Sequence, residues 1–133
     1  MHNRVHDGFV GVILCCVPAN SFLLPSGAVV GSGVSAKNWF VQGNTATGNL
    51  YAGYLVIDGA NKNLLVNNAA SGNGVYDMEL LGVTCLFGFQ TPTSFNNTVV
   101  VGSHRNITIN DFGTNNRVIG PVTVTHNVSA PCP

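Results

Sequence analysis

Short apolar runs separated by turn residues make up most of the chain. The runs are three to five residues long and rich in Val, Ile, Leu and aromatic residues, as in Leu64-Leu65-Val66. Runs this short are typical of strands and cannot be helices. Between them lie most of the 17 asparagines and 16 glycines, residue types that favour turns and the left-handed backbone region. The pattern predicts an all-β protein.

One short sequence motif recurs three times along the chain. A basic residue is followed by Asn and three largely apolar residues at 37–41, 62–66 and 105–109. The first two copies are 25 residues apart and the last two are 43 apart. Periods of 20 to 50 residues are typical of solenoids, in which each repeat stacks on the next.

Aligning the repeats gives a period of about 24 residues. Asn44 then falls on Asn68, and Gly48-Asn49 falls on Gly72-Asn73, whereas residues 59–67 align with 102–110 at an offset of 43. The excess of about 19 residues over one period requires an insertion. We place it at residues 85–97, and a second one at 19–36, which are rich in Gly, Ser and Pro.

Stacked coils explain how such short strands are stabilised. Every backbone group then pairs with the coil above and below, about 4.8 Å away, and equivalent side chains form columns. Stacked Asn side chains can join in hydrogen-bonded ladders, so Asn44 over Asn68 is the best ladder candidate. The alternative is that both are exposed turn residues. The prediction is one domain over residues 1–133 with about four coils, either complete or a fragment of a longer solenoid.

The pattern Asn-φ-x-Val-x-Asn-x-x-x-x-Gly-Asn, over roughly residues 3–120, resembles the right-handed parallel β-helix repeat proteins of the pectin lyase-like fold, which include the NosD-like group. The resemblance implies a right-handed β-helix. It says little about activity, because proteins of this fold include polysaccharide lyases, glycoside hydrolases, adhesins and other secreted proteins. The copper binding of the NosD-like group is not carried over, since the chain has no Met and His cluster.

Residues 1–20 have two interpretations. Arg4, the apolar run Phe9 to Val17 and the small-residue end Val17-Pro18-Ala19 fit a secretion signal. Alternatively, residues 3–8 repeat residues 44–49, and the chain begins within a coil. The four cysteines, Cys15, Cys16, Cys85 and Cys132, are either buried free thiols or include a disulfide through Cys85 or Cys132. No zinc-site spacing is present.

Asp77 and Glu79 are the candidate catalytic residues. Alternate residues of a strand share one face and lie about 7 Å apart, which suits a pair of glycosidase carboxylates. The five acidic residues are otherwise scattered, so the calcium-binding carboxylates of pectate lyase-like proteins find no match. His6, His104 and His126 stand in no catalytic motif. The simpler interpretation of Asp77 and Glu79 is a solvated outer face.

The recurring basic residues are the candidate ligand-binding residues. Lys37, Lys62 and Arg105 are expected to share one corner, with Lys62 and Arg105 in register and His104 beside them. Such a stripe either is simply solvated or binds an anionic ligand such as an acidic polysaccharide. Trp39, Tyr51, Tyr54 and Tyr76 could stack on sugars, although Trp39 and Tyr54 also suit a core.

Composition narrows the function. With 8% charged residues and zero net charge, the chain has no basic footprint for nucleic acid. No apolar stretch reaches the 18 or so residues of a membrane-spanning helix. We expect a non-enzymatic β-helix segment of a secreted, cell-surface or periplasmic protein, acting as a scaffold or weak carbohydrate-binding surface, without metal or cofactor. The alternative is part of a polysaccharide lyase or glycoside hydrolase. Unpaired strand edges at the ends of the stack favour end-to-end self-association.

Overall fold

The computed structural model describes residues 3–15, 22–23, 29–30, 36–82, 84–86, 89–91 and 93–126. Throughout these residues the chain forms strands and turns, which confirms the prediction of an all-β protein. In the described part of the chain, no helix has the length and apolar character needed to cross a membrane.

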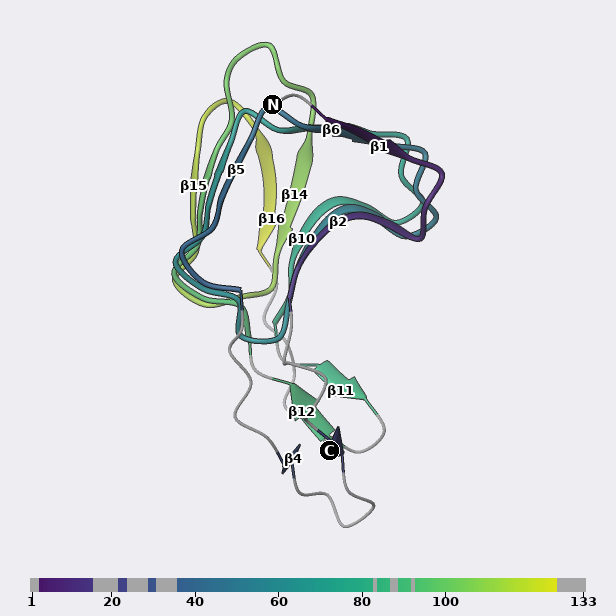
Figure 1. Cartoon of the computed structure of the whole chain (residues 1–133). Helices are drawn as coiled ribbons and strands as arrows, with labels where there is room; N and C mark the ends of the chain where they lie inside the picture. The colour runs from purple at the N-terminus through teal and green to yellow at the C-terminus, as the bar shows by residue number, and fades with distance from the viewer. Residues whose placement is uncertain are drawn as a thin grey trace.

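Three parallel sheets form the body of the protein (Figure 1). The four-stranded sheet contains β5 (Phe40–Gln42), β8 (Leu64–Val66), β13 (Thr98–Val100) and β15 (Arg117–Ile119). The three-stranded sheet contains β1 (Arg4–His6), β6 (Thr45–Thr47) and β9 (Ala69–Ser71). The five-stranded sheet contains β2 (Val10–Leu14), β7 (Ala52–Val56), β10 (Tyr76–Leu80), β14 (Thr108–Asp111) and β16 (Thr123–His126).

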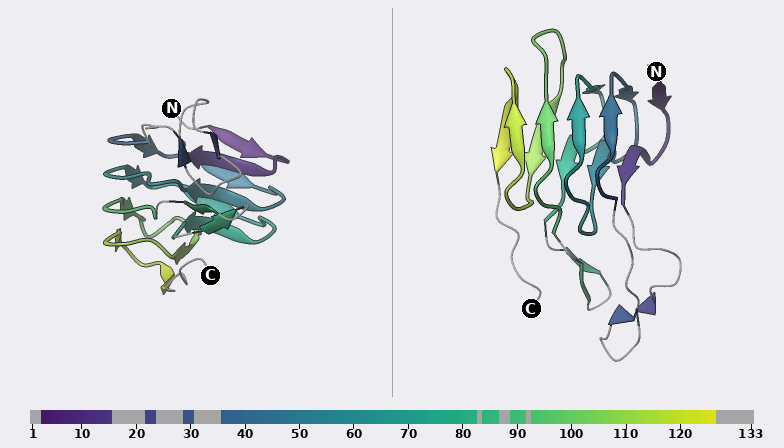
Figure 2. Two further views of the ribbon diagram at one scale, coloured as in Figure 1. Left: turned by 90° about the horizontal axis from the view of Figure 1, so that it is seen from below. Right: turned by 60° about the vertical axis from the view of Figure 1, so that its left-hand side comes forward.

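The chain visits these sheets in a recurring order. Strands β5, β6 and β7 lie in the four-, three- and five-stranded sheets, and β8, β9 and β10 repeat that order. Later passes, β13 with β14 and β15 with β16, skip the three-stranded sheet. We call each pass a winding, and Figure 2 shows the windings side by side in chain order. Strands β1 and β2 form the first described winding, as the repeat interpretation of residues 3–8 expected.

The strand register confirms a period of 24 residues for the second and third windings. Val41 pairs with Leu65, and Ala46 pairs with Ala70. The offset of 43 is wrong, because Leu65 continues to Val99 in β13. The third copy of the motif, at 105–109, instead leads into β14, where Ile109 pairs with Met78 of the five-stranded sheet.

Two antiparallel strand pairs lie outside the parallel sheets. Strands β3 (Phe22–Leu23) and β4 (Val29–Val30) form one pair, and β11 (Thr84–Leu86) and β12 (Phe89–Thr91) form the other, which projects from the body in Figures 1 and 2. The insertion placed at residues 85–97 was predicted to reach residue 97. It ends earlier, since Phe95 already forms a parallel bridge with Asn61.

Apolar columns run through the body at right angles to the strands. One column is Val41, Leu65, Val99 and Val118, and another contains Tyr54, Met78 and Ile109. Leu65, Met78 and Ile109 are almost completely buried. Burying a side chain of this size contributes about 1.5 to 3 kcal/mol, so the columns are the main apolar support of the stack.

Asparagine ladders hold the corners between strands. In each ladder the backbone N–H and the side-chain Nδ2 of one Asn donate to Oδ1 of the Asn in the next winding. Asn44 donates to Asn68 at 3.0 and 3.3 Å, which confirms the predicted ladder. A second ladder joins Asn49 to Asn73, at 3.1 and 2.9 Å. The longest ladder runs through Asn63, Asn97 and Asn116.

We call a ladder position any residue whose backbone N–H donates to Oδ1 of a ladder Asn, or any Asn that accepts in this way. The residue immediately before each such position in the windings from β5 onward has a left-handed backbone conformation. Gly48, with φ of +65°, precedes Asn49, and Lys62, with φ of +54°, precedes Asn63. The left-handed residue turns the chain, and the following Asn then points inward to satisfy backbone groups that the turn leaves unpaired. This explains why Gly and Asn recur together. The residues that precede ladder positions with positive φ are Asn38, Gly43, Gly48, Lys62, Asn67, Gly72, Asn96 and Asn115.

Two glycines, Gly11 in β2 and Gly53 in β7, allow these strands to lie close to the next strand of their sheet and to the three-stranded sheet. A Cβ on Gly53 would lie 2.7 Å from the backbone oxygen of Asp77 and 3.0 Å from Cβ of Ala70. A Cβ on Gly11 would lie 2.7 Å from the backbone oxygen of Gly53. Real Cβ atoms do not make such contacts, so this position requires glycine in both windings.

Cys15, at the end of β2, is disulfide-bonded. The interpretation of the cysteines as free thiols is therefore wrong for this residue. Disulfides persist mainly in oxidising environments and are rare in reducing ones.

Candidate functional site

Asp77, in β10, holds neighbouring windings together. Its Oδ2 accepts from the backbone N–H of Thr108 at 3.2 Å and from the Thr108 hydroxyl at 3.0 Å. Its Oδ1 accepts from Nδ2 of Asn73 at 3.2 Å. Both carboxylate oxygens of the half-buried Asp77 are therefore hydrogen-bonded, and Oδ2 links β10 to β14.

Glu79 lies two residues along β10 and is only 3% exposed, which contradicts the solvated outer face for this residue. The Tyr51 hydroxyl donates to its Oε2 at 2.9 Å. Burial raises the pKa of the Glu79 carboxyl above its usual value, and the hydrogen bond from Tyr51 offsets part of that rise. Burial, together with the nearby Glu79 carboxylate, also raises the pKa of the Tyr51 hydroxyl.

No further carboxylate joins Glu79 from the adjacent windings. Its partners in register are Leu55 on one side and Asn110 on the other. An offset of 24 residues from Glu79 gives Leu55, in agreement with this register, whereas an offset of 43 gives Val122, which differs from Asn110.

A row of four aromatic rings runs along the stack near this acid. Phe9 stacks on Tyr51 at 5.7 Å, Tyr51 meets Tyr76 edge to face at 5.8 Å, and Tyr76 meets Phe112 at 6.1 Å. Phe9 is exposed, whereas Tyr51, Tyr76 and Phe112 are half-buried, so these ring contacts join neighbouring windings. Tyr54, by contrast, is a core residue at 1% exposure.

The four candidate basic residues do not form one column. Asn97 follows Asn63 in its ladder, so Asn96, not Arg105, occupies the place after Lys62. Lys37 bridges to Asn61, which puts exposed Lys37 and Lys62 at one corner on neighbouring windings. His104 and Arg105 instead line a hollow with Asn67, Gly102 and Ser103, on the connection between β13 and β14.

Histidines form pairs with carboxylates that the sequence motifs did not reveal. Nδ1 of His6 lies 2.7 Å from Oδ2 of the adjacent Asp7, and Nδ1 of His126 lies 3.5 Å from Oδ2 of the buried Asp111. Within the described ranges, no group of three His, Cys, Asp or Glu side chains is placed to hold a metal ion.

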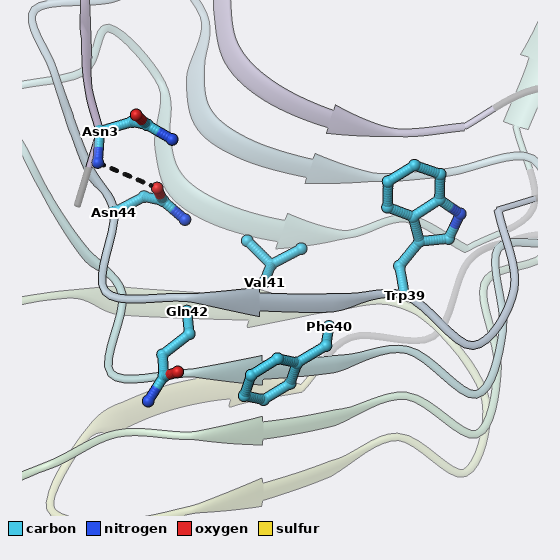
Figure 3. Close-up of a pocket in the computed structure, with 6 residues that line it drawn as sticks. All are labelled: Asn3, Trp39, Phe40, Val41, Gln42 and Asn44. Carbon is cyan, nitrogen blue, oxygen red and sulfur yellow. Dashed lines mark hydrogen bonds between the residues drawn. The ribbon is translucent and has the colours of Figure 1, made fainter. Parts of the chain in front are cut away.

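A trough along β5 is the second candidate site, and we call it the β5 trough. It is lined by Asn3, Trp39, Phe40, Val41, Gln42 and Asn44 (Figure 3). Trp39 and Val41 lie on one side of the strand, and Phe40 and Gln42 lie on the other (Figure 3). Trp39 is 60% exposed and Phe40 is 59% exposed, so the core interpretation of Trp39 is wrong.

The trough exists because β5 is the last strand of its sheet. The carbonyl of Trp39 accepts from Leu64, and the N–H of Gly43 donates to Val66, so both groups face β8. Backbone groups alternate in direction along a strand, so those of Phe40 and Gln42 face away from β8. The N–H of Asn3 donates to Oδ1 of Asn44 at 3.2 Å and places Asn3 beyond the end of β5.

Comparison with known proteins gave no match: no family model, no curated protein and no solved structure is similar to this chain.

Proposed function

We propose that the chain is a right-handed parallel β-helix. The recurring order of three parallel sheets supports this assignment, because each return to a sheet is a crossover between parallel strands, and such crossovers are almost always right-handed. The ladders and the 24-residue period support the resemblance to proteins of the pectin lyase-like fold.

The function that the geometry supports best is that of a non-enzymatic scaffold that presents a carbohydrate-binding surface. The observation that supports it most directly is the hydrogen bonding of Asp77 and the burial of Glu79, the two candidate catalytic acids. Oδ2 of Asp77 bonds Thr108 of the neighbouring winding and its Oδ1 bonds Asn73 of the same winding, whereas Glu79 is buried and accepts from the Tyr51 hydroxyl. A pair of catalytic carboxylates must both reach the glycosidic bond, and the burial of Glu79 argues against this pair doing so.

The binding surface in this proposal is the corner that bears Lys37 and Lys62. Both side chains are exposed and lie on neighbouring windings, and Lys37 is two residues before exposed Trp39. Two ammonium groups on one corner, with exposed aromatic residues following in the chain, suit an acidic polysaccharide.

An oxidising location outside the cytoplasm belongs to the same proposal. The disulfide at Cys15 supports a secreted, cell-surface or periplasmic protein, because such bonds are rare in reducing compartments. Mass spectrometry of the protein isolated from its natural source under alkylating conditions tests it. Cys15 recovered as an alkylated free thiol would contradict the assignment.

One observation favours the alternative, an enzyme of the polysaccharide lyase or glycoside hydrolase classes. A carboxyl whose pKa is raised by burial, hydrogen-bonded to a tyrosine, has the properties of a general acid. The same burial keeps Glu79 from a polysaccharide, which is why we prefer the scaffold.

Incubation with pectate, alginate and chondroitin, followed by unsaturated-product absorbance and reducing ends, separates the two functions. We expect no turnover. Turnover lost in both Asp77→Ala and Glu79→Gln variants that remain folded would overturn the scaffold assignment.

Chromatography on immobilised pectate tests the binding surface. We expect retention that falls with added salt and falls further in the Lys37→Ala, Lys62→Ala double variant. Arg105→Ala is the matched control, since it removes one positive charge at the β13–β14 connection. Equal loss of retention in this control would show a general charge effect and contradict the lysine corner.

A further inference from the structure

We propose that the hollow on the β13–β14 connection, which we call the Arg105 hollow, is a binding site for a sulfate or phosphate group. Arg105 supplies the positive charge, and Asn67, Ser103 and His104 supply further hydrogen-bond donors. The inference goes beyond the lysine corner, because it assigns a compact anion to a separate place in the molecule. The shared chemistry is a tetrahedral oxyanion, whether a free ion or an ester carried by a sugar.

The Arg105 hollow lies where the chain departs from the repeat. The second and third windings pass through β6 and β9 at this point, whereas the connection from β13 to β14 skips the three-stranded sheet and projects from the body in Figures 1 and 2. Two hydrogen bonds fix this connection to the third winding. The N–H of Gly102 donates to Oδ1 of Asn67 at 2.9 Å, and the N–H of Ala70 donates to the carbonyl of Asn106 at 3.1 Å. A connection held at both ends loses little further conformational freedom when a ligand binds.

The side chains that line the Arg105 hollow carry donors without protein acceptors. The Arg105 guanidinium, Nδ2 of Asn67, the Ser103 hydroxyl and the His104 ring can all donate. In the part of the chain that the structure describes, none of these groups donates to the protein. Both ion pairs of the described residues join a histidine to an aspartate elsewhere, so Arg105 has no carboxylate partner there. A positive charge with unused donors around it favours an anion.

The arrangement of the donors favours a tetrahedral anion over a carboxylate. A carboxylate presents two oxygens in one plane, and the fork of one arginine bonds both. In the Arg105 hollow, Asn67 belongs to the third winding and Ser103, His104 and Arg105 belong to the next, so the donors suit oxygens that point in several directions. The hollow encloses about 410 Å³, which also leaves room for the organic part of a monoester. Pectate carries carboxylates alone, so Arg105→Ala remains the control for the lysine corner.

NMR titration of the isotope-labelled full-length protein with sodium sulfate and with sodium phosphate tests this site. Sodium chloride and sodium acetate are titrated in parallel at equal ionic strength. We expect saturable shifts of the backbone amides of Ser103 and His104 and of the Asn67 side-chain amide with sulfate or phosphate. Arg105→Ala should weaken this binding by about tenfold or more, because charge-assisted hydrogen bonds are lost. Acetate that binds as tightly would overturn the tetrahedral anion.

Arg117→Ala is the matched control, since Arg117 is an exposed arginine of β15 outside the hollow. Its affinity should equal that of the unchanged protein, and the amide spectrum shows whether each variant is folded. Equal weakening in both variants, or the same shifts with chloride, would show a general charge effect and overturn the site.

A galactose sulfate monoester, compared with inorganic sulfate, identifies the source of the anion. Tighter binding of the ester would support the site with a sulfate carried by a sugar, and binding of inorganic sulfate alone would support it with a free ion. Binding of neither sulfate nor phosphate would overturn the site. None of these titrations contains a polysaccharide, so that failure would leave the proposed function to be decided by retention on pectate.

Discussion

Trp39 and Asn63 occupy the same position in neighbouring windings, yet they differ in exposure and in the part their side chains play in the ladder. Asn63 is 1% exposed and joins a ladder through its backbone and its side chain. Trp39 is 60% exposed and joins the ladder only through its backbone N–H. One is a repeated residue that satisfies buried backbone groups, and the other departs from the repeat where the sheet ends.

The contrast separates residues that maintain the stack from residues available to a ligand. Buried polar side chains recur because each winding has the same unpaired groups to satisfy. The side chain of a large aromatic residue at a ladder position satisfies no backbone group of a neighbouring winding, and an exposed ring gains little stability from burial. Departure from the repeat, combined with exposure, therefore marks a candidate site on a repeat protein better than recurrence does.

Removing the amide from the longest ladder should have the largest effect. Asn97 is fully buried, its Oδ1 accepts twice from Asn63, and its Nδ2 donates to the carbonyl of Ala60 at 3.0 Å. Asn97→Ala leaves these groups unpaired, so we expect the free energy of unfolding to fall by about 3 kcal/mol in urea titration. Asn96→Gly is the control, because Asn96 is exposed with φ of +54°, and it should change stability by less than about 0.5 kcal/mol. Equal effects would contradict the ladder.

Crowding the glycine column should have the next largest effect. The Cβ of Gly53→Ala would lie 2.7 Å from the carbonyl oxygen of Asp77, so the windings must move apart. We expect a loss of about 2 kcal/mol, measured in the same titration. At Gly8 a Cβ would make only ordinary contacts of 3.4 Å, so Gly8→Ala should cost less than half as much. The reverse ranking would show that the strands are packed differently.

Glu79 should contribute a pH-dependent term to stability. Its folded pKa is raised above its ordinary value of 4.5, so the unfolded state loses its proton first as pH rises. The contribution of this group is therefore fully present below about 4.5 and is lost as pH rises through the folded pKa. Glu79→Gln should flatten the fall in stability above pH 4.5, as followed by thermal unfolding at several pH values. An unchanged slope would contradict burial of this carboxyl.

Exchanging the two residues of the comparison should have the smallest effect on stability. Trp39→Asn exchanges an exposed ring for a ladder amide at the end of the stack, and we expect a change of no more than about 0.5 kcal/mol. A loss of stability as large as that of Asn97→Ala would show that Trp39 supports the fold.

The sequence predicts much of this fold and less of the site. The 24-residue period and the Asn44–Asn68 ladder are readable because Gly-Asn pairs recur at a fixed spacing. The sequence comparison misaligned the later windings because Arg105-Asn106 has the same basic-Asn sequence as Lys62-Asn63. In the structure Asn106 is exposed, and Asn97 is the ladder partner of Asn63. The better signal is a left-handed residue and Asn before an apolar run, as in Lys62-Asn63 and Asn96-Asn97.

The repeat pattern of the sequence could not predict which polar side chains are buried or which strand ends a sheet. Glu79 lies between the apolar residues Met78 and Leu80, so strand alternation predicts that its side chain points outward. This alternation gives no sign that Tyr51, 28 residues earlier, donates a hydrogen bond to Glu79. The exposure of Trp39 depends on β5 being the last strand of its sheet, which no local spacing reveals.

The most direct test of the central claim, that asparagine side chains join successive parallel windings, is hydrogen exchange of the Asn97 side-chain amide followed by NMR. The account predicts that these Nδ2 protons, bonded to Ala60 and Asn116, exchange on the order of a hundredfold more slowly than those of an exposed Asn such as Asn115. Exchange of Asn97 as fast as that of Asn115 in the folded protein would contradict it.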